Sequence, residues 1–270
     1  MKILSFNING LRARPHQLEA IIDRIQPDII GLQEIKVDDS QFPEEMIRNL
    51  GYHVAYHGQK SHYGVALLSR HEPVQIIKGL PGDTEDSQKR LIMGEFIYNG
   101  KPVYVFNGYF PQGENRDHPQ KFPSKLAFYK TLTKHLNEAF DPAQQVVVMG
   151  DINISPTDLD IGIGDDNAKR WLRSGKCSFL PEERALLQEL LDFGLTDSFR
   201  HFHPTINDRF SWFDYRSRGF EDTPKRGLII DAILVTQALL EQTVCSEIDY
   251  LARQMEKPSD HCPIWLELRS

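Results

Sequence analysis

Acidic residues stand close behind short apolar runs at several places in this chain. Glu34, Asp151 and Asp231 each follow such a run, and Asp260 lies in the segment 257–261 beside a histidine. A buried carboxylate loses solvation that only hydrogen-bond partners or a metal ion replace, and carboxylates that share a site repel one another unless a cation lies among them. Oxygen ligands favour Mg²⁺ or Mn²⁺ over zinc. If these runs share sheets, the sequence therefore predicts a site for a hard divalent cation.

Neutral donors and one histidine accompany the acids. Asn7 and Tyr109 come after apolar runs, and His261 ends the segment 257–261. Because side chains alternate along an extended chain, Asp151 and Asn153 share a face, so one of them could activate a water while the other orients it or a phosphate oxygen. Carboxylates, a metal, amides and a histidine suit phosphoryl chemistry, where catalysis is mostly positioning and charge stabilisation.

Each of these residues also has an ordinary structural interpretation. An Asp after a strand commonly caps the following turn. Tyr109 could be a half-buried aromatic, and His261 could be a structural histidine. Asn7 is a weak indication on its own, because asparagine is common where a strand gives way to a turn. The recurrence of the pattern is what favours a site.

Short β-branched runs predict the strands that position these groups. Polar residues follow the runs, which occupy 3–6, 29–32, 103–106, 146–149 and 229–230. Helical spacing of apolar residues occurs at 15–25, 43–50, 129–136 and 181–191. Because strands dominate and several helices lie between them, we expect a mixed α/β protein in which sheet packs on sheet with helices outside.

Composition limits the possible classes of protein. The 270 residues carry a formal net charge of −7 and are 40% apolar, which is typical of a globular protein, and we expect one domain spanning 1–270. No window approaches the roughly 18 apolar residues of a membrane span, and no export signal follows Met1. The spacing of Cys177, Cys245 and Cys262 indicates reduced thiols. We therefore expect a soluble, cytoplasmic protein without a membrane partner. The negative charge argues against coating nucleic acid through net charge.

Six blocks of sequence, in this order, resemble those of the exonuclease III family, a part of the exonuclease/endonuclease/phosphatase superfamily whose fold is shared with deoxyribonuclease I. They are 5–12 (SFNINGLR), 31–34 (GLQE), 107–113 (NGYFPQG), 150–156 (GDINISP), 208–216 (DRFSWFDYR) and 257–261 (KPSDH). The resemblance extends over essentially the whole chain.

The resemblance implies a four-layered α/β sandwich, with two mixed β-sheets packed face to face and helices on both outer sides. It implies a DNA repair nuclease that hydrolyses phosphodiesters in double-stranded DNA with Mg²⁺ or Mn²⁺. The implied activities are 3′-to-5′ exonuclease, cleavage 5′ to abasic sites, and removal of phosphates or sugar fragments that block 3′ termini. We expect a monomer whose partner is duplex DNA with an abasic site or a 3′ end.

The resemblance also implies roles for individual residues. Those implied to hold the metal, with Glu34 as the principal ligand, are Asn7, Glu34, Asp151, Asn153 and Asp260. The implied catalytic residues are Tyr109, Asp151, Asn153, Asp231 and His261. Asp151 would orient and deprotonate the attacking water, and Tyr109 would contact the scissile phosphate. His261, steadied by Asp231, would stabilise charge on a non-bridging oxygen in the transition state.

Contacts to DNA are expected from aromatic and basic residues. Phe210, Trp212 and Leu228 resemble an apolar pocket that receives a flipped abasic sugar, although aromatics that alternate along a strand are more often core. The cations expected to contact DNA are Arg90, Lys121 and Arg216, and they belong to basic clusters at 12–14, 89–90, 121–125, 169–176, 216–218 and 225–226. Such local stripes can suffice on an acidic protein because phosphate contacts dominate duplex affinity.

Two positions depart from the family pattern. Ile229 stands where arginine is usual, which puts a supporting contact near Asp231 in doubt, and Ile35 stands where threonine is usual. Two other functions stay open: a phosphatase or phosphodiesterase for small phosphoesters or lipids, and a non-catalytic DNA-binding module. The segment around Trp212 and the basic clusters favour DNA as the substrate, and the retained acids argue against a module without catalysis.

Overall fold

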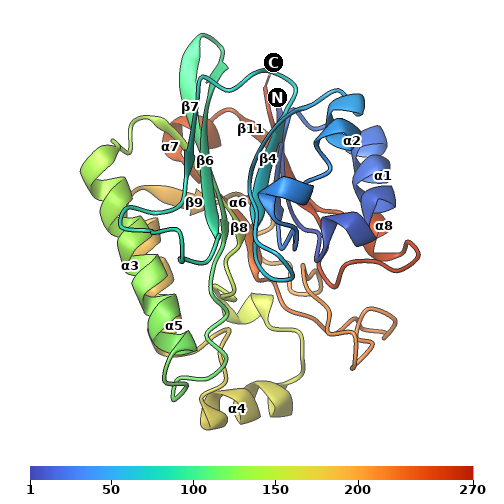
Figure 1. Cartoon of the computed structure of the whole chain (residues 1–270). Coiled ribbons are helices and arrows are strands. Elements are labelled where there is room, and N and C mark those ends of the chain that lie inside the picture. Colours follow the sequence, from blue (N-terminus) through green and yellow to red (C-terminus); the bar gives the residue numbers. More distant parts are fainter. Residues whose placement is uncertain (270) are drawn as a thin grey trace.

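Two β-sheets of six strands each, packed face to face, form the centre of the protein in residues 1–269, which the computed structural model describes (Figure 1). The first sheet, in spatial order, comprises β11 (Thr243–Ile248), β12 (Ile264–Leu268), β1 (Lys2–Asn7), β2 (Ile29–Gln33), β4 (Val65–Ser69) and β3 (His53–His57). The second comprises β5 (Gln75–Lys78), β6 (Leu91–Tyr98), β7 (Lys101–Tyr109), β8 (Gln145–Asp151), β10 (Asp231–Thr236) and β9 (Leu195–Asp197).

Both sheets are mixed, with one parallel pair in each. β1 runs parallel to β2 and β7 runs parallel to β8, whereas the other neighbours are antiparallel. Asn7 ends β1 and Asp151 ends β8, and their side chains are hydrogen-bonded. The two sheets therefore present these strand ends at one edge, away from the two chain termini at the top of Figure 1.

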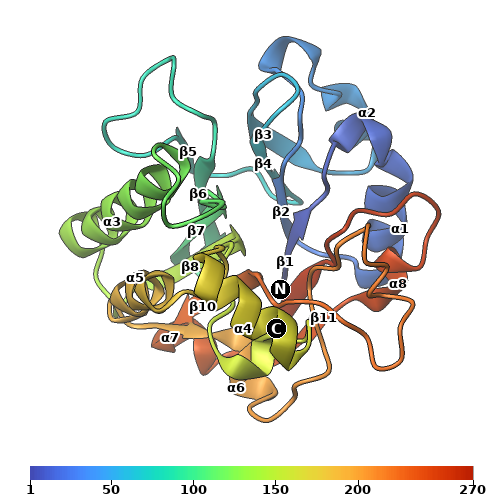
Figure 2. The ribbon, with the colours of Figure 1, turned by 90° about the horizontal axis from the view of Figure 1, so that it is seen from below.

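Helices cover both outer faces of the pair of sheets (Figure 2). The first sheet packs against α1 (Pro15–Ile25), α2 (Glu44–Asn49) and α8 (Tyr250–Arg253). The second packs against α3 (Lys121–Ala139) and α5 (Pro181–Leu191). The remaining helices are α4 (Asp165–Ser174), α6 (Ser198–Phe202), α7 (Gln237–Leu240), η1 (Leu11–Ala13), η2 (Asp39–Gln41) and η3 (Asp158–Asp160). This arrangement confirms the four-layered α/β sandwich. Within residues 1–269, no helix combines the length and apolar character needed to cross a membrane.

The layering explains why the strands are apolar runs rather than alternating patterns. In β8, Val147 and Met149 lie in the core between the sheets, whereas Val146 and Val148 pack against the helices outside. A strand that is covered on both faces buries every side chain. The predicted helix at 15–25 is confirmed as α1, which begins at a proline and buries its apolar stripe.

One predicted strand, at 229–230, is wrong, and the aromatic segment that could have been a strand is not one. Ile229 and Ile230 do not form a strand, because β10 begins at Asp231 and pairs antiparallel with β8, with Asp231 opposite Asp151. Asp231 therefore reaches the polar edge at the start of its strand and not at the end. The aromatic segment 210–216 is a loop, in which Trp212 forms only isolated bridges.

Candidate active site

Asn7 joins two carboxylates that come from different sheets. Its Nδ2 donates to Glu34 Oε1 and to Asp151 Oδ2, both at 2.9 Å. Glu34 directly follows β2, and its backbone has a left-handed φ of 48°. Glu34, Asp151 and His261 offer ligand atoms that all lie within 4.8 Å of one another. The acids that the sequence placed after separate apolar runs thus meet at one point.

His261 lies between two aspartates. Its Nδ1 is 2.8 Å from Asp231 Oδ2, and its Nε2 is 3.6 Å from Asp151 Oδ2. The Ser211 hydroxyl donates to Asp231 Oδ2 at 2.7 Å and accepts the backbone N–H groups of Ile230 and Asp231. Asp231 is therefore fixed by Ser211 and in turn orients the imidazole, as the sequence analysis expected.

Burial and neighbouring charge set the protonation of this group. Burial raises the pKa of Asp151 to about 8; His261 opposes the rise, and Asp231 and Glu34 add to it. Burial disfavours charged His261 as well, but Asp231 and Asp151 outweigh it, so the pKa of His261 is raised well above its usual value. At neutral pH, His261 is then an imidazolium, which can donate hydrogen bonds but cannot ligate a metal.

The carboxylates of Glu34 and Asp151 fit a divalent metal ion. Two carboxylates that converge beside one amide form a donor set of hard oxygens, and Mg²⁺ is commonly held by one or two carboxylates plus water and phosphate oxygens. The Glu34 side chain is also 19% exposed, so the site is open to substrate. Asn7 turns its Nδ2 toward the carboxylates while its Oδ1 accepts the N–H of Asn9 at 3.1 Å. In this conformation, Asn7 bridges the two acids and does not present its oxygen as a ligand.

Asp260 lies outside this cluster, contrary to its expected role as a metal ligand. Its Oδ1 accepts from Asn9 Nδ2 and its Oδ2 accepts from Trp212 Nε1, both at 3.0 Å. Both carboxylate oxygens are therefore occupied by neutral donors. Asp260 fixes Trp212 beside the acids instead of joining them.

Asn153 and Tyr109 border the acids. The Asn153 N–H donates to Asp151 Oδ1 at 3.2 Å, and its Nδ2 donates to the backbone oxygen of Phe110 at 2.9 Å. Burial raises the pKa of Tyr109 well above its usual value, with Glu34 and Asp151 adding to the effect. The Tyr109 hydroxyl thus stays protonated and can donate to an anion.

Two basic hollows flank the acids. The first, the tyrosine hollow, has a volume of about 410 Å³ and is lined by residues that include Tyr63, Arg90, Tyr109 and Lys121. The second, the tryptophan hollow, has a volume of about 380 Å³ and is lined by residues that include Arg170, Trp171, Lys176, Trp212, Arg216 and Arg226. Arg90, Lys121 and Arg216, the cations expected to contact DNA, therefore all line hollows next to the acid cluster.

Arg90 lies between two aromatic rings. Its guanidinium is 4.3 Å from the ring centre of Tyr63 and 4.8 Å from that of Tyr109, and its Nη1 donates to the backbone oxygen of Tyr109 at 2.9 Å. Arg90 thus holds Tyr109 in place as well as lining the hollow. Sequence reasoning missed Tyr63, and no signal in the chain separates it from an ordinary loop tyrosine.

Trp212 and Leu228 lie together, as expected for an apolar pocket, but Phe210 does not join them. Leu228 and Trp212 exchange backbone hydrogen bonds and share a small apolar cluster with Ile230 and Phe179. Phe210 is only 2% exposed and packs in the core between the sheets. We therefore no longer assign Phe210 to DNA. Ile230, in the pocket cluster, is the apolar residue that sequence reasoning overlooked.

The two departures from the family pattern leave these contacts intact. Ile229 is buried in the core between the sheets, and its N–H donates to the backbone oxygen of Asp160. Asp231 takes its hydrogen bonds from Ser211 and His261, so it needs no side chain at position 229. Ile35 is buried with the core under α1.

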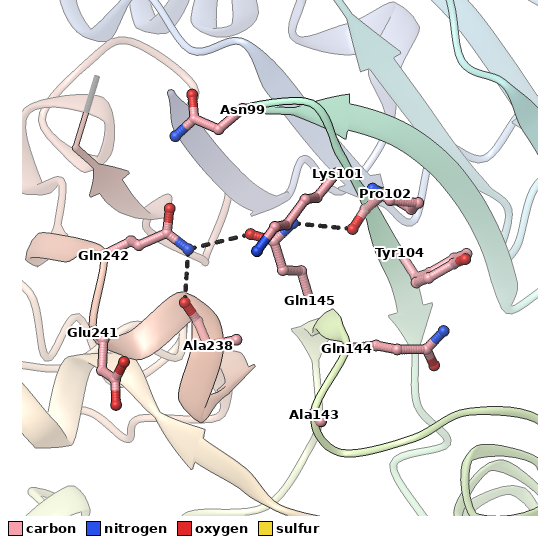
Figure 3. A pocket seen from close by; sticks show the side chains of 10 residues that line it. All are labelled: Asn99, Lys101, Pro102, Tyr104, Ala143, Gln144, Gln145, Ala238, Glu241 and Gln242. Atoms are coloured by element: carbon pink, nitrogen blue, oxygen red, sulfur yellow. Dashed lines mark hydrogen bonds between the residues drawn. The ribbon is translucent and has the colours of Figure 1, made fainter.

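A larger hollow, of about 620 Å³, lies far from the acids (Figure 3). It opens where β7 and β8 begin, whereas Tyr109 and Asp151 end these strands. Its amide side chains bond within the protein: Gln242 Nε2 donates to Gln145 Oε1, and Gln145 Nε2 donates to the backbone oxygen of Pro102. No cluster of titratable groups faces it among the residues described, so the chemistry belongs to the acid cluster.

Known proteins with similar sequences and structures include nucleases. Residues 4–261 match the group described as the Endonuclease/Exonuclease/phosphatase family. The chain is 62% identical to Exodeoxyribonuclease III of Haemophilus influenzae over 269 residues, which cover 100% of both proteins. Among solved structures it resembles an AP endonuclease from Archaeoglobus fulgidus, with 32% identity and a TM-score of 0.90. It also resembles a variant of the 3′ phosphatase NExo from Neisseria bound to a product DNA hairpin, with 36% identity and a TM-score of 0.89. Each structural match covers 100% of both chains.

Proposed function

Because the chain belongs to the Endonuclease/Exonuclease/phosphatase family, we propose that it is a metal-dependent DNA repair nuclease that hydrolyses phosphodiesters in double-stranded DNA. Its activities are 3′-to-5′ exonuclease, abasic-site endonuclease and 3′-end cleaning. The observation that carries the proposal is a buried acid cluster flanked on two sides by hollows that combine cations with aromatic rings. Cations contact phosphates, and aromatic rings contact sugars and bases.

The metal ion we propose is Mg²⁺ or Mn²⁺, held by Glu34 and Asp151. When bound, it would polarise a phosphate oxygen and favour ionisation of a nearby water. Asn7 holds the two carboxylates at a fixed separation through its Nδ2. That Asn153 also ligates stays a prediction, and Asp260 is not proposed as a ligand because its oxygens accept from Asn9 and Trp212.

Protons move through Asp151 and His261 in the proposed mechanism. Asp151 takes the proton of the attacking water, because its carboxylate ends β8 inside the acid cluster, with Oδ2 3.6 Å from His261 Nε2. Imidazolium His261, oriented by Asp231, donates to a non-bridging phosphate oxygen as negative charge develops there. Tyr109 donates its hydroxyl to the scissile phosphate, and Asn153 orients the water or a phosphate oxygen.

In this proposal, the two hollows bind the DNA on either side of the scissile bond. Lys121 and Arg90 contact phosphates from the tyrosine hollow, and Arg216 does so from the tryptophan hollow. The apolar cluster of Trp212 and Leu228 receives the abasic sugar, because it lies beside the acid cluster, where Trp212 pairs with His261.

We also propose that the protein is a single domain that works as a monomer in the bacterial cytoplasm. The two sheets share one core, with residues of both sheets in the same apolar cluster, which supports a single folding unit. One set of acids and flanking hollows lies within one chain, so catalysis needs no second copy. A repair nuclease works in the compartment that holds the chromosome.

A duplex oligonucleotide with one abasic site tests the proposed function. We expect the protein to nick it in Mg²⁺ and to leave it intact in EDTA. Asp151→Asn should reduce turnover by at least about 10³-fold, because it removes the base and a metal ligand. The matched control is Asp23→Asn, which changes an exposed aspartate on α1 in the same way and should cut at the wild-type rate.

Two outcomes would overturn the proposal. A fully active Asp151→Asn variant would remove Asp151 from the mechanism. Faster turnover of a soluble phosphomonoester than of abasic duplex would indicate a small-molecule phosphatase instead. Parallel reactions on blunt and 3′-phosphate duplexes give the balance among the three activities.

A further inference from the structure

Lys125 on α3 and Glu183 in the first turn of α5 form an ion pair that water does not reach. Both side chains are 0% exposed, and Lys125 Nζ donates to Glu183 Oε1. In the sequence, Lys125 belongs with Lys121 to a basic cluster that could contact DNA. That interpretation is wrong for Lys125, because its side chain is fully buried and its ammonium contacts Glu183; α3 and α5, which carry the two residues, lie side by side in Figure 1.

The ammonium of Lys125 has an acceptor for each of its three protons. Besides Glu183, it donates to the backbone oxygen of Asn153 at 2.7 Å and to that of Gln112 at 3.2 Å. A buried cation tolerates desolvation only with such complete hydrogen bonding. Two of its three bonds therefore go to loops next to the acid cluster.

Glu183 extends the same set of contacts to a third segment. Its Oε2 accepts the N–H groups of Ser178 at 3.0 Å and Leu180 at 2.8 Å. The backbone oxygen of Ser178 in turn accepts the N–H of Ser155 at 2.8 Å. Segment 176–180, which follows α4 and begins at Lys176 of the tryptophan hollow, is thereby tied to the loop that carries Asn153.

The two loops held by Lys125 carry residues of the proposed mechanism. Asn153 has a left-handed φ of 52°, a conformation that asparagine adopts more readily than most non-glycine residues. Gln112 lies three residues after Tyr109, and Asn153 Nδ2 donates to the oxygen of Phe110 between them. Lys125 thus contacts the backbone of both loops, while the backbone N–H of Asn153 donates to Asp151 Oδ1.

We propose that Lys125, with Glu183 as its counter-ion, is a positioning residue for the phosphodiester hydrolysis proposed above, on which this inference rests. It sets the position of Asn153 and of the loop after Tyr109 relative to Asp151, and it touches neither DNA nor metal. Stability alone does not account for the pair, because buried ion pairs can commonly be replaced by uncharged residues of similar size without loss of stability.

The test removes both charges together, since removing only one strands a buried charge. In Lys125→Met/Glu183→Gln, the new amide oxygen can still accept the N–H groups of Ser178 and Leu180, while the oxygens of Asn153 and Gln112 lose their donor. With Mg²⁺ and abasic duplex, we expect kcat to fall about 10- to 100-fold. KM and the Mg²⁺ concentration at half-maximal rate should stay within about threefold of wild type, since Lys125 contacts neither DNA nor the carboxylates of Glu34 and Asp151.

A double-mutant cycle distinguishes positioning from general loosening. The bond from Lys125 to Asn153 is shorter than its bond to Gln112, and Asn153 in turn holds Phe110 in the loop after Tyr109, so we expect Lys125 to act mainly through Asn153. Adding the paired replacement to Asn153→Ala should then lower the single-turnover rate by less than about threefold further. Leu136→Ala is the stability control, because Leu136 is buried on the same helix but packs under the sheet away from these loops. It should lower the thermal midpoint without lowering kcat at 20 °C.

The outcomes are separable from those of the proposed function. Failure of wild-type protein to cut abasic duplex counts against the function, whereas the positioning role is measured relative to a wild type that cuts. A folded paired variant with wild-type kcat, or losses that multiply fully with Asn153→Ala, would overturn the role of Lys125. If the paired variant does not fold, Glu183→Asp takes its place: it keeps both charges but draws the carboxylate back by one methylene. A lower kcat with unchanged KM is then expected, and an unchanged kcat would overturn the proposal.

Discussion

Replacing Asn107 by alanine should destabilise the protein by about 3 kcal/mol, because this side chain joins the two sheets. Its Nδ2 donates to the backbone oxygens of Leu32 at 3.0 Å and Ala66 at 2.9 Å in the facing sheet, and its Oδ1 accepts from Gln33 Nε2 at 2.6 Å. Position 31 is glycine at this point, since a Cβ there would lie 2.6 Å from Asn107 Oδ1. Each of the three buried hydrogen bonds contributes about 1 kcal/mol net.

The loss can be measured by heat or by urea on the metal-free protein. Unfolding entropy of about 2.1 cal/mol/K per residue gives roughly 0.6 kcal/mol/K for a chain of this length, so 3 kcal/mol lowers the midpoint by about 5 °C. The control is Asn137→Ala on α3, where an exposed amide donates only to the backbone oxygen of Thr133. Its stability should change by no more than about 0.5 kcal/mol.

A second replacement separates hydrogen bonding from packing. Asn107→Asp keeps the shape of the side chain but turns carboxylate oxygens toward the carbonyl oxygens of Leu32 and Ala66, so at pH 7 it should destabilise at least as much as alanine. A loss below about 1 kcal/mol for both variants would show that Asn107 does not hold the sheets together. The consequence reaches the site, because Gln33, which Asn107 accepts from, directly precedes Glu34.

Three further predictions concern the site and its supports. Ser211→Ala should lower kcat about tenfold with KM unchanged, because Asp231 loses the hydroxyl that orients it; a shift confined to KM would contradict this. Trp212→Ala should slow abasic cleavage about tenfold more than 3′-phosphate removal, measured on matched duplexes, and equal losses would remove Trp212 from the sugar pocket. Burial and Asp160 raise the pKa of Asp197 to about 6. Between about pH 4 and pH 6, the Asp197 carboxyl is therefore protonated in the folded protein but ionised in the unfolded chain, so the free energy of unfolding of the wild type falls as pH rises through this range. Asp197→Asn should therefore match wild type at pH 4 and exceed it by about 2 kcal/mol at pH 7 in urea titrations, whereas a constant difference would contradict the raised pKa.

The acid cluster was accessible to sequence reasoning because it depends on local pattern. Glu34 directly follows the buried strand β2 and Asp151 ends the buried strand β8, and the ends of such strands gather at a sheet edge, so their meeting follows once both sheets exist. Asp231 lies on the same edge, but at the start of its strand and not at the end that the sequence predicted. It opens an antiparallel strand, and a single sequence gives no sign of strand direction when the run before it is equally apolar.

Residues whose role depends on a distant partner were not accessible in this way. A lysine in a helix is normally solvated. Burial of Lys125 requires a counter-ion that compensates the lost solvation of its charge, and this counter-ion is Glu183, 58 residues later in the chain. Phe210 and Trp212 are equivalent in a strand pattern, yet the loop turns one into the core and the other toward Asp260. In each case, the sequence shows which side chain is present, but whether that side chain is buried or exposed depends on contacts with residues far away in the chain.

The net charge of −7 illustrates the same limit for electrostatics. It would oppose DNA if the charge were spread evenly, but the tryptophan hollow is lined by four cations, Arg170, Lys176, Arg216 and Arg226, against one acid, Asp214. At physiological ionic strength, exposed charges more than about 8 Å away are largely screened, so acids on remote faces contribute little at this surface. Half-buried Glu34 and buried Asp151 add to the negative total, yet a divalent ion bound between them would offset their charge. What governs DNA binding is therefore the charge within a Debye length of the hollows, and because that charge acts through phosphate contacts, affinity should fall steeply with salt despite the acidic composition.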